Sequence, residues 1–556
     1  MILASKEDIK QYTDAGYWGE ITLMDMFKEN VGKNPDREFL VDAPNKEDLV
    51  GLRPERLSCK ETDRIVDTLA TSFLKMGVKK DDVVVIQLPN IVEMPLTYLA
   101  LWRIGAIPSP VPIQWRSHEL DYIFPLTGAK VFITLEEFGG FKHIEVGRKM
   151  QEKHSFLKEV ISLEQLKGLC EGDIDPEGIE QNTPTANDIA TVCYTSGTEA
   201  APKACPLSHN NWIFQGGIIS QTALAKEGSR MLLPSPLVNM TAFSTMFVPV
   251  ILHNGGLVLH HPFDVELYMK QLIEENITGT VSVPAMLVML LKHPDIDNRD
   301  FSNLQFLITG SAPPPIWTLE EFKRRWDIDI LNGWGQNEGT VLTAGILDIP
   351  DMDTRTRNFP GWGRKGYKSP VKRSEGIVAK IVDVDTNTEL TEPGEVGELA
   401  YKGPGTMPCY FRQPEYTEAS FDEQGLFHTG DLFEVRPNNL VGFFDRKKDI
   451  IIRGGQNISA AEVENIAKAH TMVLDAAAVD MPDEKLGEKV CLYVVPQDGH
   501  LVTLESMSSF MKDEGIAIYK HPQRIEMIDV IPRNPLGKVV KPPLRKDIRK
   551  KLEKEA

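Results

Sequence analysis

Several widespread signatures of catalysis are missing from this chain. Its six cysteines are scattered, without a CxxC pair or a Cys/His spacing typical of a metal site, which fits reduced thiols rather than a disulfide framework. The pattern GxxxxGK followed by Ser or Thr does not occur, and no serine stands in a GxSxG elbow. A GxGxxG match at Gly361 follows Pro360 directly, without a preceding strand. These observations disfavour a zinc protein, Walker-type nucleotide binding, a serine hydrolase and a dinucleotide-binding fold.

Long apolar runs and positive charge are also scarce. The most apolar stretch, residues 231–252, is interrupted by three prolines and Asn239, and the charged residues at positions 6–8 do not fit a signal peptide. The net charge of −19 argues against nucleic acid or an anionic membrane as a partner. We therefore expect a cytoplasmic protein without a membrane span, and both monomer and homodimer remain open.

The first part of the chain alternates between helix-type and strand-type patterns. Residues 57–76 and 92–104 have helical periodicity, and residues 83–88 between them form a continuous apolar run. Further apolar runs lie at residues 131–134, 189–194, 256–259, 279–283 and 304–309. Buried strands separated by helices are typical of parallel sheets covered by helices. The sequence therefore predicts an α/β fold, with two such sheets in a large N-terminal domain and ligands bound where the strands end.

A different pattern begins near Gly376. Short strand-like pieces predict a small β-rich subdomain over about residues 370–445. The following residues have the pattern of a compact α+β unit, with strands at 450–453, 476–479 and 489–495 and helices at 460–469 and 504–513. We expect an N-terminal domain over residues 1–447 and a smaller C-terminal domain over residues 448–556.

The stretch Tyr194-Thr195-Ser196-Gly197-Thr198-Glu199-Ala200-Ala201-Pro202-Lys203 follows one of the apolar runs. Its hydroxyls, glycine and lysine suit the oxygens of a polyphosphate, although a plain surface turn would have a similar composition. The stretch resembles the signature of the AMP-forming acyl- and aryl-CoA synthetases. This adenylating superfamily also holds the adenylation domains of peptide synthetases and the luciferases. Glu199, Ala200 and Ala204 depart from the family pattern.

The resemblance implies a set of residues around ATP. Residues 332–338 resemble the family's Tyr-Gly-x-Thr-Glu stretch, with Asn337 in place of threonine, and residues 310–313 resemble the loop on the other side of adenine. Glu338 and Thr198 would help to hold the magnesium ion that accompanies ATP, a task suited to hard oxygen ligands. The phosphates would contact Thr195, Ser196, Gly197, Thr198, Lys203 and Asn337. Adenine and ribose would contact Gly310, Ser311, Ala312, Asn332, Gly333, Trp334, Gly335, Asp431 and Arg446.

The resemblance also extends into the C-terminal residues. Residues 532–541 resemble the family's stretch that carries the lysine for adenylate formation, which here is Lys538. The catalytic residues would be Lys538, Glu338, Arg446 and Thr198. Lys448 matches the hinge of a mobile C-terminal domain. Gly454, Gly455 and Gln456 would line the CoA channel, where a residue without a side chain leaves room for the pantetheine arm.

The acyl group would lie against Asn239, Met240, Phe243, Val283, Gly335 and Gln336, again by resemblance. Many relatives have a histidine where this chain has Asn239, and the segment 236–246 contains no lysine or arginine. We therefore favour an uncharged cyclic, aromatic or medium-chain carboxylate.

Each of these stretches alone also fits a plain structural role, namely a turn, a glycine-rich loop with a buried tryptophan, or an exposed basic tail. At least five motifs occur in the family's order along nearly the whole chain, which favours the resemblance. It implies an ATP-dependent carboxylate–CoA ligase with Mg²⁺ as cofactor, CoA as co-substrate and a reaction that is reversible when pyrophosphate is plentiful. Three alternatives remain: an adenylating enzyme that loads a carrier protein, a luciferase-type oxygenase, and a catalytically silent acyl-nucleotide binding protein.

Overall fold

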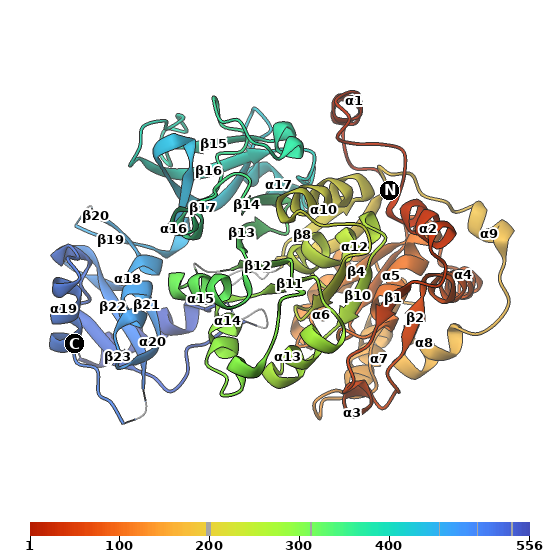
Figure 1. Cartoon of the computed structure of the whole chain (residues 1–556), viewed down its shortest axis with the longest axis horizontal. Helices are drawn as coiled ribbons and strands as arrows, with labels where there is room; N and C mark the ends of the chain where they lie inside the picture. The colour runs from red at the N-terminus through yellow and green to blue at the C-terminus, as the bar shows by residue number, and fades with distance from the viewer. Residues whose placement is uncertain (196–201, 312–313, 455, 498, 535–537, 556) are drawn as a thin grey trace. The chain divides into compact units, whose positions relative to one another are not determined.

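The computed structural model describes residues 1–195, 202–311, 314–454, 456–497, 499–534 and 538–555 (Figure 1). Within these ranges the chain forms two compact units. Unit 1 comprises residues 1–195, 202–378 and 401–427, and unit 2 comprises residues 379–400 and 428–555. The division passes through the β-rich segment, so the boundary expected between residues 447 and 448 stays a prediction.

The larger sheet of unit 1 has eight strands in the order β14-β13-β12-β11-β9-β10-β1-β2. The pairs from β13 to β1 are parallel, as the apolar runs predict, whereas β13–β14 and β1–β2 at the two ends are antiparallel. The strands span Glu38–Val41 (β1), Arg56–Ser58 (β2), Arg230–Leu233 (β9), Gly256–Leu259 (β10), Gly279–Ser282 (β11), Phe306–Gly310 (β12), Ile330–Gln336 (β13) and Thr340–Ala344 (β14).

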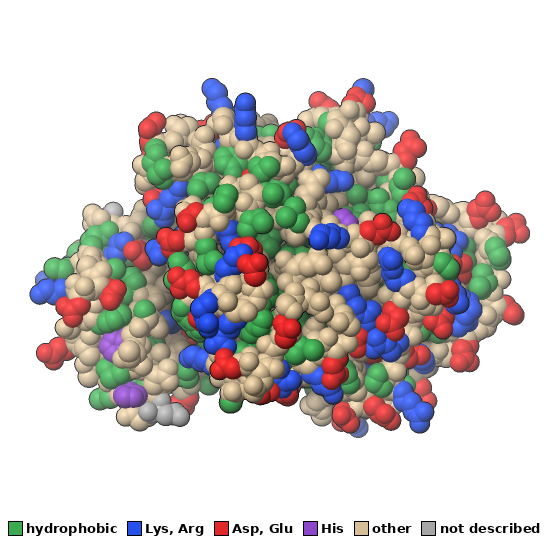
Figure 2. Space-filling model, in the orientation of Figure 1, with side chains coloured by type: hydrophobic (Ala, Val, Ile, Leu, Met, Phe, Trp, Pro, Cys, Tyr) green, Lys and Arg blue, Asp and Glu red, His purple; other side chains and the backbone are tan. Residues whose placement is uncertain are grey.

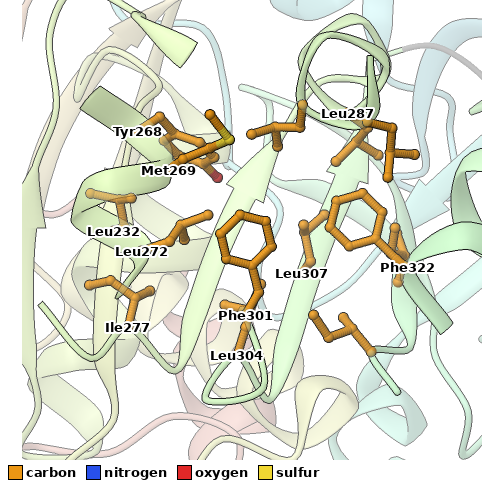
Figure 3. Packing of buried hydrophobic residues seen from close by; sticks show 14 of the residues in the cluster. Leu232, Tyr268, Met269, Leu272, Ile277, Leu287, Phe301, Leu304, Leu307 and Phe322 are labelled. Atoms are coloured by element: carbon orange, nitrogen blue, oxygen red, sulfur yellow. The ribbon is translucent and has the colours of Figure 1, made fainter. Parts of the chain in front are cut away.

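One face of this sheet is covered by α13 (Val265–Glu274), α14 (Pro284–Leu291) and α15 (Ile316–Trp326). Side chains from these helices and from five strands form one buried apolar cluster. Figure 3 shows Tyr268, Met269 and Leu287 from the helices packed over Leu232 and Leu307 from the strands. Burial of this cluster holds the parallel strands in register, and their carboxyl ends therefore share one edge.

A second sheet of unit 1 has four parallel strands in the order β4-β3-β5-β6. They span Val83–Ile86 (β3), Ile107–Pro110 (β4), Val131–Ile133 (β5) and Glu159–Ile161 (β6). The two helices expected around β3 are present as α4 (Cys59–Lys75) and α5 (Glu93–Arg103). A capping box between Ser58 and Glu61 fixes the start of α4. Two further strands, β7 (Ile189–Tyr194) and β8 (Ala204–Ser208), form a separate antiparallel pair, so the expectation that the apolar run 189–194 belongs to a parallel sheet is wrong.

The remaining helices of unit 1 are mostly short. They are α1 (Lys6–Asp14), α2 (Leu23–Lys33), α3 (Lys46–Val50), α6 (Ser117–Thr127), α7 (His143–Lys153), α8 (Leu163–Leu169), α9 (Pro176–Glu180), α10 (His209–Ala223), α11 (Met240–Ala242), α12 (Val248–Leu252), α16 (Met352–Arg357) and α17 (Pro414–Ser420). The residues between α11 and α12, Phe243–Phe247, form a π-helix.

Unit 2 contains most of the β-rich segment and the α+β unit. The β-rich segment forms a four-stranded sheet of β15 (Val378–Val382), β16 (Val396–Lys402), β17 (Phe427–Val435) and β18 (Val441–Arg446). The α+β unit contains the predicted helices as α18 (Ala460–Ala469) and α19 (Leu504–Asp513). Its sheet consists of β19 (Ile450–Arg453), β20 (Gln456–Ser459), β21 (Val473–Asp483), β22 (Gly487–Pro496) and β23 (Arg524–Met527). A third helix, α20 (Pro542–Glu555), packs on this sheet through Leu544 and Ile548.

None of the helices in the described ranges combines the length and apolar character needed to span a bilayer. Acidic and basic side chains are interspersed over the face of the molecule that Figure 2 presents.

A buried charge cluster joins three elements of unit 1. The Lys46 Nζ atom of α3 lies 2.7 Å from Asp42 Oδ2, just after β1, and 2.8 Å from Glu93 Oε1 of α5. The three side chains are at most 1% exposed. Asp42 also accepts hydrogen bonds from the Val92 and Glu55 N–H groups. Burial raises the pKa of Asp42 to about 6 despite the nearby ammonium group.

Substituting Lys46 by methionine leaves the buried Asp42 carboxylate without its cation and leaves Glu93 with only the more distant Lys167, at 3.9 Å. We expect Lys46→Met to lower the free energy of unfolding by about 3–5 kcal/mol at pH 8, the usual cost of breaking a buried pair. The loss should be smaller at pH 5, because the raised pKa of Asp42 lets the carboxyl take up a proton in the folded state.

Lys28→Met is the matched control in urea titrations at both pH values. Lys28 also pairs with two carboxylates, Asp63 and Asp67, but its side chain is 30% exposed. Its replacement should cost only about 0–1 kcal/mol. Equal losses for the two variants, or a Lys46→Met loss that does not depend on pH, would contradict this account.

Candidate functional site

Strands β7 and β8 bracket the proposed phosphate loop. The Thr195 N–H donates to the Lys203 carbonyl at 3.0 Å, and the Lys203 N–H donates to Thr195 Oγ1 at 3.3 Å. The predicted phosphate contacts Ser196, Gly197 and Thr198 lie outside the described residues. Ala204, where the family has glycine, is a buried residue of β8 whose N–H donates to Gln413 Oε1. This position therefore has no need of glycine's backbone freedom.

Lys203, Glu338 and Tyr410 come together from three segments of unit 1. The Lys203 Nζ atom lies 5.0 Å from the ring centroids of both Tyr410 and Tyr416. The Tyr410 hydroxyl donates to Glu338 Oε1 at 2.9 Å, and Glu338 is 8% exposed. Burial and the Glu338 carboxylate raise the pKa of Tyr410, so the phenol keeps its proton and serves as the donor. Sequence reasoning missed Tyr410, whose only signal is its aromatic ring in a proline- and glycine-containing segment.

The carboxyl ends of β11, β12 and β13 align the next set of predicted residues. Ser282, Thr309 and Asn332 form one row across the three strands, and Gly310 stands opposite Gly333 in the following row. A Cβ atom on Gly310 would lie 2.5 Å from the Gly333 carbonyl oxygen, so this position requires glycine.

The structure also describes most of the other predicted site residues near the ends of β12 and β13. Ser311 follows β12 with φ of 73°, and Ala312 lies outside the described residues. The Asn332 Nδ2 atom donates to the Thr356 carbonyl at 3.0 Å, which ties β13 to α16. Trp334 and Gln336 are half-buried on β13, while Gly335 is exposed.

The predicted acyl-binding residues follow the ends of β9 and β11. Asn239 caps α11 through a hydrogen bond from the Ala242 N–H to its Oδ1 atom, and Val283 precedes α14 as a half-buried residue. Met240 is 5% exposed and Phe243 is 0% exposed. The Phe243 ring stacks on Trp212, with ring centroids 4.8 Å apart. Phe243 therefore packs against Trp212 in the interior of unit 1. Its direct contact with a substrate stays a prediction.

Unit 2 holds the two predicted ribose contacts side by side. Asp431 of β17 and Arg446 of β18 stand opposite each other in the antiparallel register, and Asp431 is 8% exposed. The Asp431 N–H donates to Thr429 Oγ1 at 3.2 Å, which fixes the Thr-Gly-Asp turn.

Glu398 of β16 supports this pair and was not foreseen from the sequence. Its Oε1 atom accepts from the Gly430 N–H at 2.8 Å, and its Oε2 atom lies 3.1 Å from Lys447 Nζ. Burial acts to raise the pKa of Glu398, but hydrogen bonds from His428, Gly430 and Lys447 outweigh it and lower the pKa to about 2. Glu398 is therefore an anion at neutral pH. It holds Gly430 and Lys447, which are the chain neighbours of Asp431 and Arg446. A lone glutamate in a short strand pattern carries no signal of this role.

The proposed hinge and the proposed catalytic lysine are both anchored within unit 2. The Lys448 carbonyl accepts from Arg545 Nη2 at 3.0 Å, and Arg545 also pairs with Asp449. Asn534 and Lys538 exchange two hydrogen bonds, since the Lys538 N–H donates to Asn534 Oδ1 and the Asn534 N–H donates to the Lys538 carbonyl. These two hydrogen bonds hold the Lys538 backbone beside Asn534.

The predicted CoA loop lies at the turn between β19 and β20. Gly454 has φ of 56°, and its N–H donates to the Leu486 carbonyl at 2.8 Å. Gln456 is exposed, and Gly455 lies outside the described residues.

The donor set fits a magnesium ion that arrives with ATP. Within the described ranges, no three His, Cys, Asp or Glu side chains are grouped as a metal site. Mg²⁺ bound to a nucleotide needs only one or two protein carboxylates, because phosphates and water supply the other ligands. Glu338, oriented by Tyr410, is suited to that task.

These features are compatible with an enzyme whose nucleotide would bind at the carboxyl ends of parallel strands. A family model described as "AMP-binding enzyme" matches residues 27–411, and one described as "AMP-binding enzyme C-terminal domain" matches residues 462–538. The chain therefore belongs to the AMP-binding enzyme family. It is an AMP-forming adenylating enzyme of the acyl- and aryl-CoA ligase superfamily, which confirms the resemblance seen in the sequence.

Curated relatives of similar length include a CoA ligase and an AMP ligase. The chain is 29% identical to the medium-chain fatty-acid–CoA ligase of Escherichia coli strain K12, over 98% of this chain and 93% of that protein. It is also 29% identical to the 2,3-dihydroxybenzoate-AMP ligase of Bacillus subtilis strain 168, over 97% of this chain and 96% of that protein. The crystal structure of ATP-bound MatB from Rhodopseudomonas palustris has the same fold, with a TM-score of 0.80 at 22% identity over 95% of this chain and 99% of that chain.

We expect Tyr410→Phe to weaken Mg²⁺ binding at Glu338. Loss of the phenol donor leaves the carboxylate without its orienting hydrogen bond, and the loss of such a supporting group typically costs about 10–100-fold in metal affinity or activity. The Mg²⁺ concentration for half-maximal pyrophosphate exchange should rise by about 10-fold, and the protection of the folded protein from heat by Mg²⁺ and ATP should fall in parallel.

Tyr416→Phe is the matched control, because Tyr416 shares the contact with Lys203 and lies 6.3 Å from Tyr410 between ring centroids. An unchanged Mg²⁺ dependence in Tyr410→Phe, or the same shift in both variants, would refute the role of the Tyr410 hydroxyl.

Proposed function

We propose that this protein is an ATP-dependent carboxylate–CoA ligase that works in two steps at one site. In the first step a carboxylate oxygen attacks the α-phosphate of ATP, and pyrophosphate leaves. In the second step the CoA thiol gives up its proton and attacks the acyl carbon, so that AMP leaves and a thioester forms. The observation that carries this proposal is that unit 2 anchors both Lys538 and the glycine turn at Gly454, the groups assigned to the two steps.

The first step has a clear electrostatic demand. Attack by one anion on another builds negative charge in the transition state, and a positioned ammonium group offsets it. Lys538 would supply this group, while Lys203 would bind phosphate oxygens and Glu338 would hold Mg²⁺. The ion would polarise the phosphate oxygens when it is bound.

A domain movement about Lys448 would let the protein pass from adenylate formation to thioester formation. The hydrogen bond from Arg545 to the Lys448 carbonyl holds residues 448–449 to the body of unit 2. Rotation would then exchange the turn of Lys538 for the turn of Gly454 at the nucleotide.

The acyl group is proposed to be uncharged and cyclic, aromatic or medium-chain. The segment 236–246 has an apolar wall around Met240 and Phe243, with no lysine or arginine to pair a second substrate charge. The names of the two curated relatives, a medium-chain fatty-acid–CoA ligase and a dihydroxybenzoate-AMP ligase, are compatible with this class.

A carrier-loading enzyme is the second candidate. The relatives include aryl-AMP ligases and a pyochelin synthase, 27% identical over 99% of this chain. Such an enzyme would share the adenylation chemistry but would pass the acyl group to a protein-bound thiol instead of free CoA.

AMP release from the purified protein with MgATP tests the proposal. It is measured with and without CoA, for benzoate, cyclohexane carboxylates and straight-chain acids of increasing length. CoA-dependent AMP with one class of acid is expected. Pyrophosphate exchange without acylation of CoA would overturn the CoA step and favour the carrier-loading candidate.

Lys538→Ala should separate the two half-reactions. We expect adenylate formation to fall by about 10²-fold or more, the scale of losing one charge-stabilising donor. Attack of CoA on a supplied acyl-adenylate should change little, because that step uses the other turn of unit 2. Single-turnover assays of each half-reaction make the comparison, with Lys550→Ala on the exposed face of α20 as the control. Equal losses in both half-reactions would contradict the two-conformation scheme.

A further inference from the structure

The carboxamide of Asn337 joins two parts of unit 1 that the proposed function assigns to different substrates. Its Oδ1 atom accepts a hydrogen bond from the Met240 N–H at 2.8 Å. Its Nδ2 atom donates to the Tyr194 carbonyl at 2.6 Å. Met240 begins α11 at the predicted acyl pocket, and Tyr194 is the last residue of β7 before the predicted phosphate loop.

The Tyr194 end of this link is held firmly. Its hydroxyl lies 2.6 Å from Ser109 Oγ, its ring centroid lies 5.5 Å from that of Trp115, and the residue is 6% exposed. The next residue, Thr195, closes the base of the loop with Lys203. Asn337 therefore bonds to the last carbonyl before the bracketed loop begins.

The Met240 end belongs to an irregular helical segment. Helix α11 is a single turn capped by Asn239, and the π-helix Phe243–Phe247 follows it directly. π-Helical turns are rare and frequently occur at functional sites. A shift of α11 towards or away from a bound acyl group would move the Met240 N–H and thereby act on Asn337.

Both ends of the carboxamide are needed for this arrangement. Asparagine offers an acceptor oxygen and a donor nitrogen in one rigid plane, and the two backbone groups use one of each. The contacts favour a role in positioning over the direct phosphate contact that the resemblance implies for this residue.

We propose that Asn337 is a positioning residue that couples nucleotide binding beside Tyr194, Thr195 and Lys203 to the conformation of the acyl-pocket segment 240–247. This inference rests on the proposed function, because it takes Thr195 and Lys203 as phosphate contacts and α11 as part of the acyl site. It adds that the two substrates influence each other's binding through one side chain. Such coupling must be reciprocal, so each substrate changes the affinity for the other by the same factor.

Hydrogen exchange tests the link without knowledge of the acid. The full-length protein is saturated with Mg²⁺ and the α,β-methylene analogue of ATP, which cannot transfer its AMP group to a carboxylate, and amide exchange is followed by mass spectrometry. In the wild type, exchange within residues 240–247 should slow by about 5-fold or more, the low end of common coupling factors. In Asn337→Ala, exchange in the 204–208 strand should still respond to the analogue, but the response of residues 240–247 should be lost.

Two further variants sharpen the result. Asn337→Asp has the same size and keeps an acceptor for the Met240 N–H, but it has no donor for the Tyr194 carbonyl, so its response at 240–247 should also be lost at saturating analogue. Asn210→Ala is the matched control. Asn210 is 1% exposed, and its amide accepts from the Gly19 N–H and donates to the Gly19 carbonyl and to Asn187 Oδ1. This variant should lose stability and keep the response.

The outcomes separate this inference from the proposed function. A wild type that binds the analogue without slowing exchange at 240–247, or an Asn337→Ala protein that keeps the slowing, overturns the coupling. Coupling together with failure to acylate CoA overturns the ligase proposal alone. Failure of the wild type to bind the analogue overturns both.

Discussion

The close parallel pairing of β12 with β13 is the constraint on which the proposed nucleotide site of unit 1 depends. Gly310 and Gly333 stand opposite each other, and there is no space for a Cβ atom on Gly310 beside the Gly333 carbonyl. Because β9, β11, β12 and β13 run in parallel, their polar loops emerge at one edge. The segment of Asn239, the residue Val283, the turn at Ser311 and the stretch that ends in Glu338 all start from that edge. Apolar packing under α13, α14 and α15 sets the positions of the strand ends, and the polar residues lie on short segments that follow these ends.

In unit 2, hydrogen bonds and ion pairs hold the predicted ribose contacts and the proposed hinge. The antiparallel register places Asp431 opposite Arg446, and one carboxylate, Glu398, holds the residues next to each of them. Arg545 likewise holds residues 448–449, because it donates a hydrogen bond to the Lys448 carbonyl and pairs with Asp449. These supports are hydrogen-bonded ions, which keep their geometry only while they stay ionised, and the lowered pKa of Glu398 ensures this at neutral pH.

The sequence was sufficient to predict the α/β class, the parallel strands β3, β5, β10, β11 and β12, and the helices α4, α5, α18 and α19. Continuous apolar runs such as 279–283 and amphipathic periodicity such as that of 460–469 depend only on neighbouring residues. They therefore indicate an element without knowledge of the tertiary fold. The antiparallel edge strands β2 and β14 and the strand β23 were not predicted, since short edge strands have weak patterns of their own. For the site, motifs located Glu338, Asp431 and Lys538, but they could not show Tyr410 or Glu398. These supports come from segments 72 and 32 residues away from the groups they contact, and only the fold brings them together.

The central claim is that the carboxylate attacks the α-phosphate of ATP before the thioester forms. The most direct test uses the acid that gives the fastest AMP release, labelled with ¹⁸O in both carboxylate oxygens, in a complete turnover with MgATP and CoA. The account predicts one ¹⁸O atom in each AMP and none in pyrophosphate, because the attacking oxygen stays on phosphorus when CoA displaces AMP. Unlabelled AMP, or label in pyrophosphate, would contradict it.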